Sequence, residues 1–342
     1  WENEGDVIEI RRAKAYGAAL SHTTPTIWPG EKLVMNKTKN WRGAFPFPWV
    51  DASFFNAQAE ALMNEADAPP LAAADAVSVV GAGGGNVTKN FGNVISIAQK
   101  FGMRKEEIPV LVKVSKYWDN ASVERVSDRY SKIVPEYDKW KGYRDSVLIM
   151  FDSWAIPQGR EVINYYMPLE YGFDRIIEMC DEKIAEVLGE AGDDGILGMS
   201  RGYYYVATKE ITKGLSRWAD NYGKRAEFLA GIEADPAQKK DYEEIAQVMH
   251  NIAHKKPATF REALQLTFLC HLGVVNEDPQ SGMSIGRLGQ VLQPFYEKDI
   301  ADGVTTDEEV EELLELYRIK ITSIECFASS GVTGGGLSGN TF

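Results

Sequence analysis

Four segments in the middle of the chain are predicted to be consecutive α-helices, and they constrain the fold more than any other feature. They are residues 170–189, 207–232, 236–254 and 260–272. Helices that follow one another in this way bury their apolar faces against one another around a shared core. No internal repeat or low-complexity linker divides the 342 residues, so we expect a single domain.

Further elements are expected on both sides of this series. Helices are predicted over residues 1–20, 51–68 and 122–133, and from Gly286 onward. Residues 76–80 and 108–114 are rich in β-branched side chains, which is typical of strands. Together these elements predict a helix-rich α/β fold with a minority of buried strands.

The pattern changes near the end of the chain. Thr305 with Glu308, or Thr306 with Glu309, has the spacing of a capping box and predicts the start of a helix. At residues 319–324 the apolar spacing changes from helical to alternating. This change predicts a strand that enters the core.

Composition excludes several classes of protein. The formal net charge of −13 disfavours a nucleic-acid surface, which needs clustered Lys and Arg. Cys180, Cys270 and Cys326 are far apart and form no CxxC motif, so neither a disulfide scaffold nor a structural zinc site is expected. The chain has no run of eighteen apolar residues, so we expect no membrane-spanning helix and a cytoplasmic protein.

Two glycine-rich segments resemble nucleotide-binding loops without completing either motif. Gly81–Gly85 follows a predicted strand, but Asn86 stands where the dinucleotide motif needs its third glycine. Residues 331–338 have the frame of a phosphate loop with Leu337 in place of the lysine. A nucleotide-binding module built on Gly81–Gly85 remains an alternative interpretation.

The histidines favour structural roles. His250 and His254 share one helix face, but Asn251 stands where a zinc protease needs glutamate. Histidines at a helix C-terminus are favoured by the helix dipole. His271 and Cys270 lie in an apolar stretch and are expected to be core residues.

Three stretches resemble the pyruvate formate-lyase-type glycyl radical enzymes. The first is Pro257–Gln265 with His271–Leu272, and the second is Ser284–Gln290 with Pro294–Tyr296 and Asp299–Ile300. The third is the basic N-terminal helix followed by Pro29–Lys37. The order and spacing of these stretches agree with the family over nearly the whole chain.

Within that family, three segments are similar to the fumarate-adding branch, the catalytic subunits of the benzylsuccinate synthase kind. They are Ser281–Tyr296, Trp154–Tyr166 and Ile324–Phe342. Gly289, where many family members have Asp, is shared with this branch. The alternative within the family is a formate acetyltransferase-like enzyme or a diol dehydratase.

The resemblance implies a ten-stranded α/β barrel wrapped by helices, of which residues 1–342 are an incomplete part. It implies a glycyl radical installed by a separate S-adenosylmethionine-dependent activating enzyme, with no cofactor bound. The glycyl radical oxidises a cysteine to a thiyl radical, which takes hydrogen from a hydrocarbon such as toluene before addition to fumarate. Small accessory subunits and a homo-oligomer of heteromers are further expectations.

The resemblance also places the residues of the site. The chain opens at Trp1 and closes inside a glycine-rich segment, so we expect an internal fragment that lacks both the catalytic cysteine and the radical glycine. Part of the pocket wall is expected to remain. Its candidate substrate-binding residues are Tyr143, Leu337, Phe327 and Phe342.

Overall fold

The computed structural model describes residues 5–37, 162–189, 195–277 and 284–324, together with seven single positions between 106 and 136. Contacts divide the chain into two units. The first comprises Trp1–Lys39, Ile163–Glu277 and Ile285–Ile321, and it contains every helix discussed below except the last residues of α13. In the second unit, an isolated parallel bridge pairs Val162 with Ser284.

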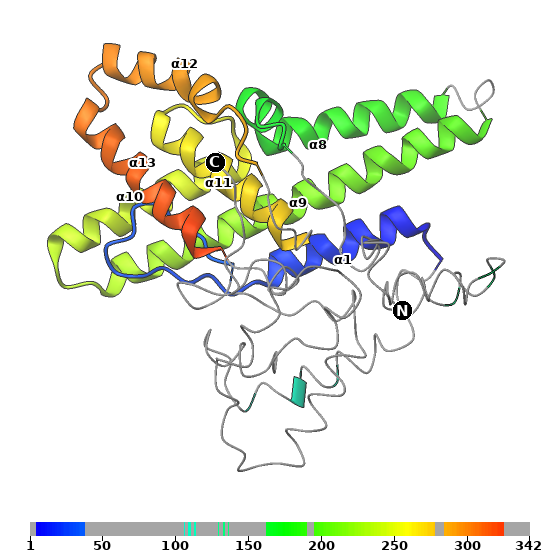
Figure 1. The fold of residues 1–342 in the computed structure, drawn as a ribbon, viewed down its shortest axis with the longest axis horizontal. Helices are drawn as coiled ribbons and strands as arrows, with labels where there is room; N and C mark the ends of the chain where they lie inside the picture. Colours follow the sequence, from blue (N-terminus) through cyan, green and yellow to red (C-terminus); the bar gives the residue numbers. More distant parts are fainter. Residues whose placement is uncertain are drawn as a thin grey trace. The chain divides into compact units, whose positions relative to one another are not determined.

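The first unit is a helical assembly, as the sequence predicts (Figure 1). Its helices are α1 (Ile8–His22), α8 (Tyr166–Gly189), α9 (Gly195–Ile232), α10 (Pro236–His254), α11 (Phe260–Glu277), α12 (Leu288–Ala301) and α13 (Asp307–Ser323). The long helix α9 contacts α1, α8, α10 and α11, so it is the centre of the packing. None of the described helices is long and apolar enough to cross a membrane.

Helix α10 matches its predicted bounds because both the cap and the first turn are encoded locally. The Asp235 side chain accepts a hydrogen bond from the backbone N–H of Ala237 at 3.1 Å. Pro236 occupies the first turn, where its missing N–H costs nothing. Helix α9, in contrast, begins at Gly195 rather than at residue 207.

Helix α13 corrects the strand predicted over residues 319–324: residues 319–323 are helical, and Ile324 follows in a β-bridge. The capping box is the Thr306–Glu309 pair, in which Glu309 accepts from the Thr306 N–H at 3.1 Å and the Thr306 hydroxyl accepts in return. The helix continues to Ser323: Tyr317 and Ile321, one helical turn apart, are both buried, whereas Ile319, which an alternating pattern would place beside Ile321, is 48% exposed. Residues 319–324 fit both an alternating and a helical pattern, so the sequence alone did not separate the two.

Of the two strands predicted nearer the N-terminus, one lies outside the described residues and the other is contradicted where it is described. Residues 76–80 lie outside the described part of the chain, as does the helix predicted over 51–68. Pro109, Val110 and Lys113 are helical, so the strand over 108–114 is wrong at those positions. Short apolar runs do not distinguish a strand from a buried helix by periodicity alone.

At two glycines the backbone lies so close to another segment that a Cβ atom would clash. A Cβ atom at Gly214 of α9 would lie 2.5 Å from the Cα of Gly17 in α1, so the two backbones are in direct contact. In α8, Gly172 has φ 73° and interrupts the helix. A Cβ there would lie 2.3 Å from the backbone nitrogen of Lys256, in the turn that connects α10 to α11.

Candidate functional site

The most elaborate buried polar arrangement in the described residues surrounds an extended segment, residues 31–37, which we call the strap. The strap has no regular secondary structure. Leu33, Val34 and Met35 are at most 1% exposed, so their peptide groups cannot rely on water for hydrogen bonds. Side chains from the surrounding helices bind these groups instead.

Helices α9 and α11 bind the middle of the strap. The Gln265 amide accepts from the Val34 N–H at 2.8 Å and donates to the Val34 carbonyl at 3.1 Å, which satisfies both peptide groups of that residue. The Tyr222 hydroxyl accepts from the Asn36 N–H at 3.1 Å. Burial raises the pKa of Tyr222 to about 12, so the phenol remains neutral.

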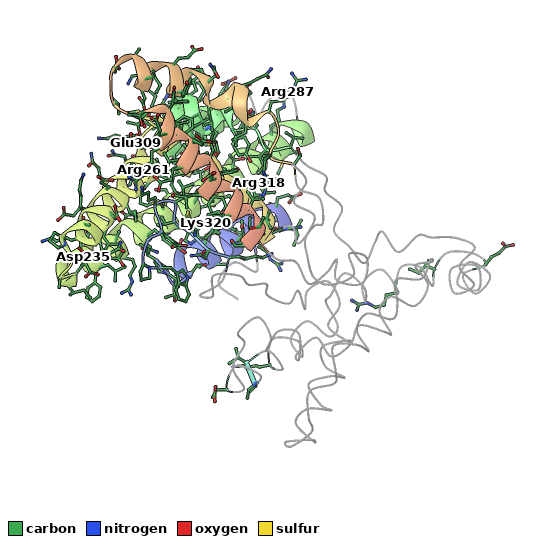
Figure 2. All side chains as sticks on the ribbon, turned by 60° about the vertical axis from the view of Figure 1, so that its left-hand side comes forward. Asp235, Arg261, Arg287, Glu309, Arg318 and Lys320 are labelled. Atoms are coloured by element: carbon green, nitrogen blue, oxygen red, sulfur yellow. The ribbon has the colours of Figure 1, made fainter. Side chains whose placement is uncertain are left out.

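Helix α13 contributes a buried cation, Lys320 (Figure 2). Its Nζ lies 2.5 Å from a carboxylate oxygen of Glu31, 3.1 Å from the Met35 carbonyl and 3.0 Å from the Asn36 side-chain oxygen. The two charged side chains are 5% and 10% exposed. Burial lowers the pKa of Lys320, and the Glu31 carboxylate opposes that shift.

Two residues of the family-like stretches, Arg261 and Asp299, support this arrangement. Arg261 pairs with Glu244 at 2.7 Å and donates to the Lys32 carbonyl of the strap at 3.2 Å. Asp299, 1% exposed, accepts from the N–H of Phe260 at the start of α11. Negative charge at a helix N-terminus is stabilising, so Asp299 holds α12 against α11.

A pocket of about 510 Å³ lies beside these residues, between α10, the first turn of α11 and α13. Its three cations pair with carboxylates of the same pocket: Lys32 with Glu312 at 2.6 Å, and both Arg261 and Lys240 with Glu244. The lining also contains Asp241, Glu262, Asp299 and Glu309, so carboxylates outnumber the cations and none of these three cations is left for an anionic ligand.

A second buried cluster joins Tyr165, just before α8, with Cys270 and His271 of α11 and Tyr317 of α13. The Tyr165 hydroxyl lies 3.4 Å from Nδ1 of His271, which is fully buried. Burial raises the pKa of Cys270 to about 12, so its thiol is protonated and a poor nucleophile. The prediction that Cys270 and His271 are core residues is confirmed.

The histidine pair of α10 is divided between different partners. His250 lies 2.8 Å from a carboxylate oxygen of Asp220 and 3.3 Å from one of Glu227, and both acidic residues belong to α9. His254 lies 3.2 Å from Asp174 of α8. Among the described residues, no group of three or more His, Cys, Asp or Glu side chains could hold a metal ion.

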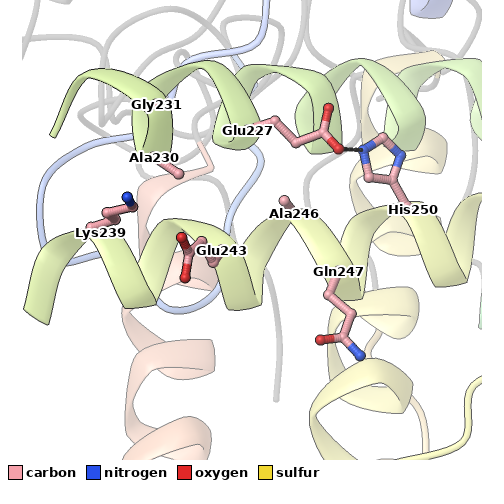
Figure 3. A pocket seen from close by; sticks show the side chains of 8 residues that line it. All are labelled: Glu227, Ala230, Gly231, Lys239, Glu243, Ala246, Gln247 and His250. Carbon is pink, nitrogen blue, oxygen red and sulfur yellow. Dashed lines mark ion pairs between the residues drawn. The ribbon is translucent and has the colours of Figure 1, made fainter. Parts of the chain in front are cut away.

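Figure 3 shows the surface groove that His250 borders, between α9 and α10. The groove has a volume of about 480 Å³, and Ala230, Gly231 and Ala246 contribute small residues to its lining. The Glu227–His250 pair closes one end. The contacts of His250 with Asp220 and Glu227 attach α10 to α9. The sequence predicted a structural role for His250 from the helix dipole and did not identify these partners.

The residues predicted to contact substrate lie outside the described part of the chain. They are Tyr143, Leu337, Phe327 and Phe342. The same is true of Cys326, of Gly81–Gly85 and of residues 331–338. In contrast, the residues that bind the strap were not predicted, because their contacts join segments more than 180 residues apart.

Comparison with known proteins decides the family. The model of the pyruvate formate lyase-like family matches residues 1–342, the whole chain. The chain belongs to this family. The predicted resemblance to the pyruvate formate-lyase-type enzymes is therefore confirmed.

Several similar members of the family are named as decarboxylases. The chain is 75% identical over 342 residues to the 4-hydroxyphenylacetate decarboxylase glycyl radical subunit of Clostridium scatologenes, covering all of this chain and 38% of that protein. Identity to the subunit of the same name in Clostridioides difficile (strain 630) is 55%, with the same coverage. Indoleacetate decarboxylase of Tractidigestivibacter scatoligenes is 29% identical, over 96% of this chain and 36% of that protein. The chain thus spans less than two fifths of the length of these relatives.

Solved structures of the family have the same fold. Hydroxyproline dehydratase of Clostridioides difficile, solved with trans-4-hydroxy-L-proline, superposes with a TM-score of 0.75 at 20% identity, over 95% of this chain and 36% of that one. A glycyl radical enzyme from Archaeoglobus fulgidus gives 0.71 at 23% identity, over 95% and 37%. Apart from bridge residues Val162, Ser284 and Ile324 and the connecting segments, the described residues show the helical part of this fold.

The assignment to the fumarate-adding branch is wrong. The strong matches are 4-hydroxyphenylacetate decarboxylases, at 75% and 55% identity across the entire chain, and not enzymes that add hydrocarbons to fumarate. The described part of Ser281–Tyr296 includes the first turns of α12, whose Val291 and Leu292 are buried. Short motifs of this kind do not distinguish one branch from another, and the alternative of another glycyl radical enzyme fits better.

Proposed function

We propose that the protein to which this chain belongs is a glycyl radical lyase that decarboxylates 4-hydroxyphenylacetate. The observation that carries the proposal is the 75% identity over all 342 residues to a subunit of that name. The relative named for indoleacetate is consistent with the same substrate class, because both acids carry a –CH2–COO⁻ group on an aromatic ring.

The reaction is redox-neutral and balances simply. The bond between the methylene carbon and the carboxylate carbon breaks, CO2 leaves, and overall the methylene carbon keeps the electron pair and takes up one proton to give 4-methylphenol. In the proposal, a glycyl radical made by an S-adenosylmethionine-dependent activating enzyme generates the thiyl radical that starts this chemistry. Exclusion of water and oxygen from the site protects such intermediates.

The present chain would supply the helical support and part of the wall of a partial ten-stranded barrel. Tyr143 remains the proposed aromatic neighbour of the substrate ring, and Leu337, Phe327 and Phe342 remain proposed apolar wall residues. The name of the relatives, a glycyl radical subunit, supports assembly with a further subunit as well as with the activating enzyme.

The test uses the full-length protein with its activating enzyme under anoxic conditions. Electron paramagnetic resonance first verifies that the glycyl radical is present. We then expect 4-hydroxyphenylacetate to be converted to equal amounts of 4-methylphenol and CO2, measured by gas chromatography with mass spectrometry. Indoleacetate is the comparison substrate, and toluene with fumarate is expected to give no benzylsuccinate.

The outcomes separate the alternatives. Radical-containing enzyme that leaves 4-hydroxyphenylacetate unchanged would overturn the proposal. Faster turnover of indoleacetate would move the assignment to another arylacetate. For the wall residue, Tyr143→Ala should raise KM for the aromatic acid while the radical signal is retained, and an unchanged KM would remove Tyr143 from the site.

A further inference from the structure

We draw no further inference here: the strongest candidate, the pocket of about 510 Å³ between α10, α13 and the first turn of α11, carries none, because its three cations already pair with its own carboxylates and its two atoms without a hydrogen-bond partner among the described residues, Asp299 Oδ1 and Arg261 Nε, belong to side chains whose charges Lys298 and Glu244 already pair.

Discussion

The buried Lys320–Glu31 pair gives a quantitative prediction for how firmly the strap is held. Lys320→Met keeps the length of the side chain and removes its charge. The Glu31 carboxylate, 10% exposed, then stays buried without a counter-charge. Removing one partner of a buried ion pair costs about 3–5 kcal/mol. Because each 1.4 kcal/mol is a factor of ten, local opening of the strap should become about 100 to 4,000 times more frequent.

Hydrogen exchange of the full-length protein, followed by mass spectrometry, measures this opening directly. Peptides that cover residues 31–37 and the last turns of α13 should lose protection in Lys320→Met. Peptides from the middle of α9 serve as an internal reference. The matched control is Lys32→Met on the same strap, whose ion pair with Glu312 is 36% and 48% exposed. Exposed pairs contribute about 0–1 kcal/mol, so this variant should exchange almost like the wild type.

A double-mutant cycle tests the cause. Glu31→Gln removes the stranded charge, so Lys320→Met combined with Glu31→Gln should recover a large part of the protection lost in Lys320→Met alone. The reasoning is refuted if Lys320→Met changes strap exchange less than tenfold. It is equally refuted if the two substitutions are additive, because additivity means that the charges do not interact.

Three further predictions follow from close contacts and burial. Gly214→Ala forces a methyl group against Gly17 and should lower stability by about 1–3 kcal/mol, whereas Gly231→Ala on the same helix meets nothing within 4 Å and should be neutral or stabilising in thermal unfolding. Gly172→Ala combines a positive φ of 73° with a backbone clash, so it should reduce the yield of folded protein more than Gly214→Ala does. Equal yields of the two variants would contradict the added cost of the positive φ. Cys270 should resist iodoacetamide at pH 8 in the native protein and react after unfolding. Rapid labelling of the native protein would contradict the burial of this thiol. Because burial raises the pKa of Cys270 from 9.0 to about 12, the contribution of this residue to stability should fall as pH rises from 9 to 12.

Sequence patterns predicted the elements whose boundaries are encoded locally. Asp235 and Pro236 mark the start of α10, and Thr306 with Glu309 marks the start of α13. The end of α13 was predicted wrongly, because residues 319–324 fit an alternating pattern and a helical one equally well. The burial of Ile321 and the exposure of Ile319 decide in favour of the helix.

The polar contacts of the strap could not be predicted because they depend on distant pairs. Gln265 binds Val34 across 231 residues, and Lys320 binds Glu31 across 289. No local periodicity carries such information. The substrate class could not be read from short motifs either, since the motif residues that the structure describes serve helix packing. Identity along the whole chain distinguishes the branches.

The distance along the chain between the strap and Lys320 has a consequence for biosynthesis. A ribosome adds about 5–20 residues per second, so roughly 15–60 s separate the synthesis of Glu31 from that of its buried partner. During that interval Leu33, Val34 and Met35 lack the last helix that holds them. The nascent polypeptide therefore presents an apolar, unpaired stretch that chaperones can recognise until α13 has emerged.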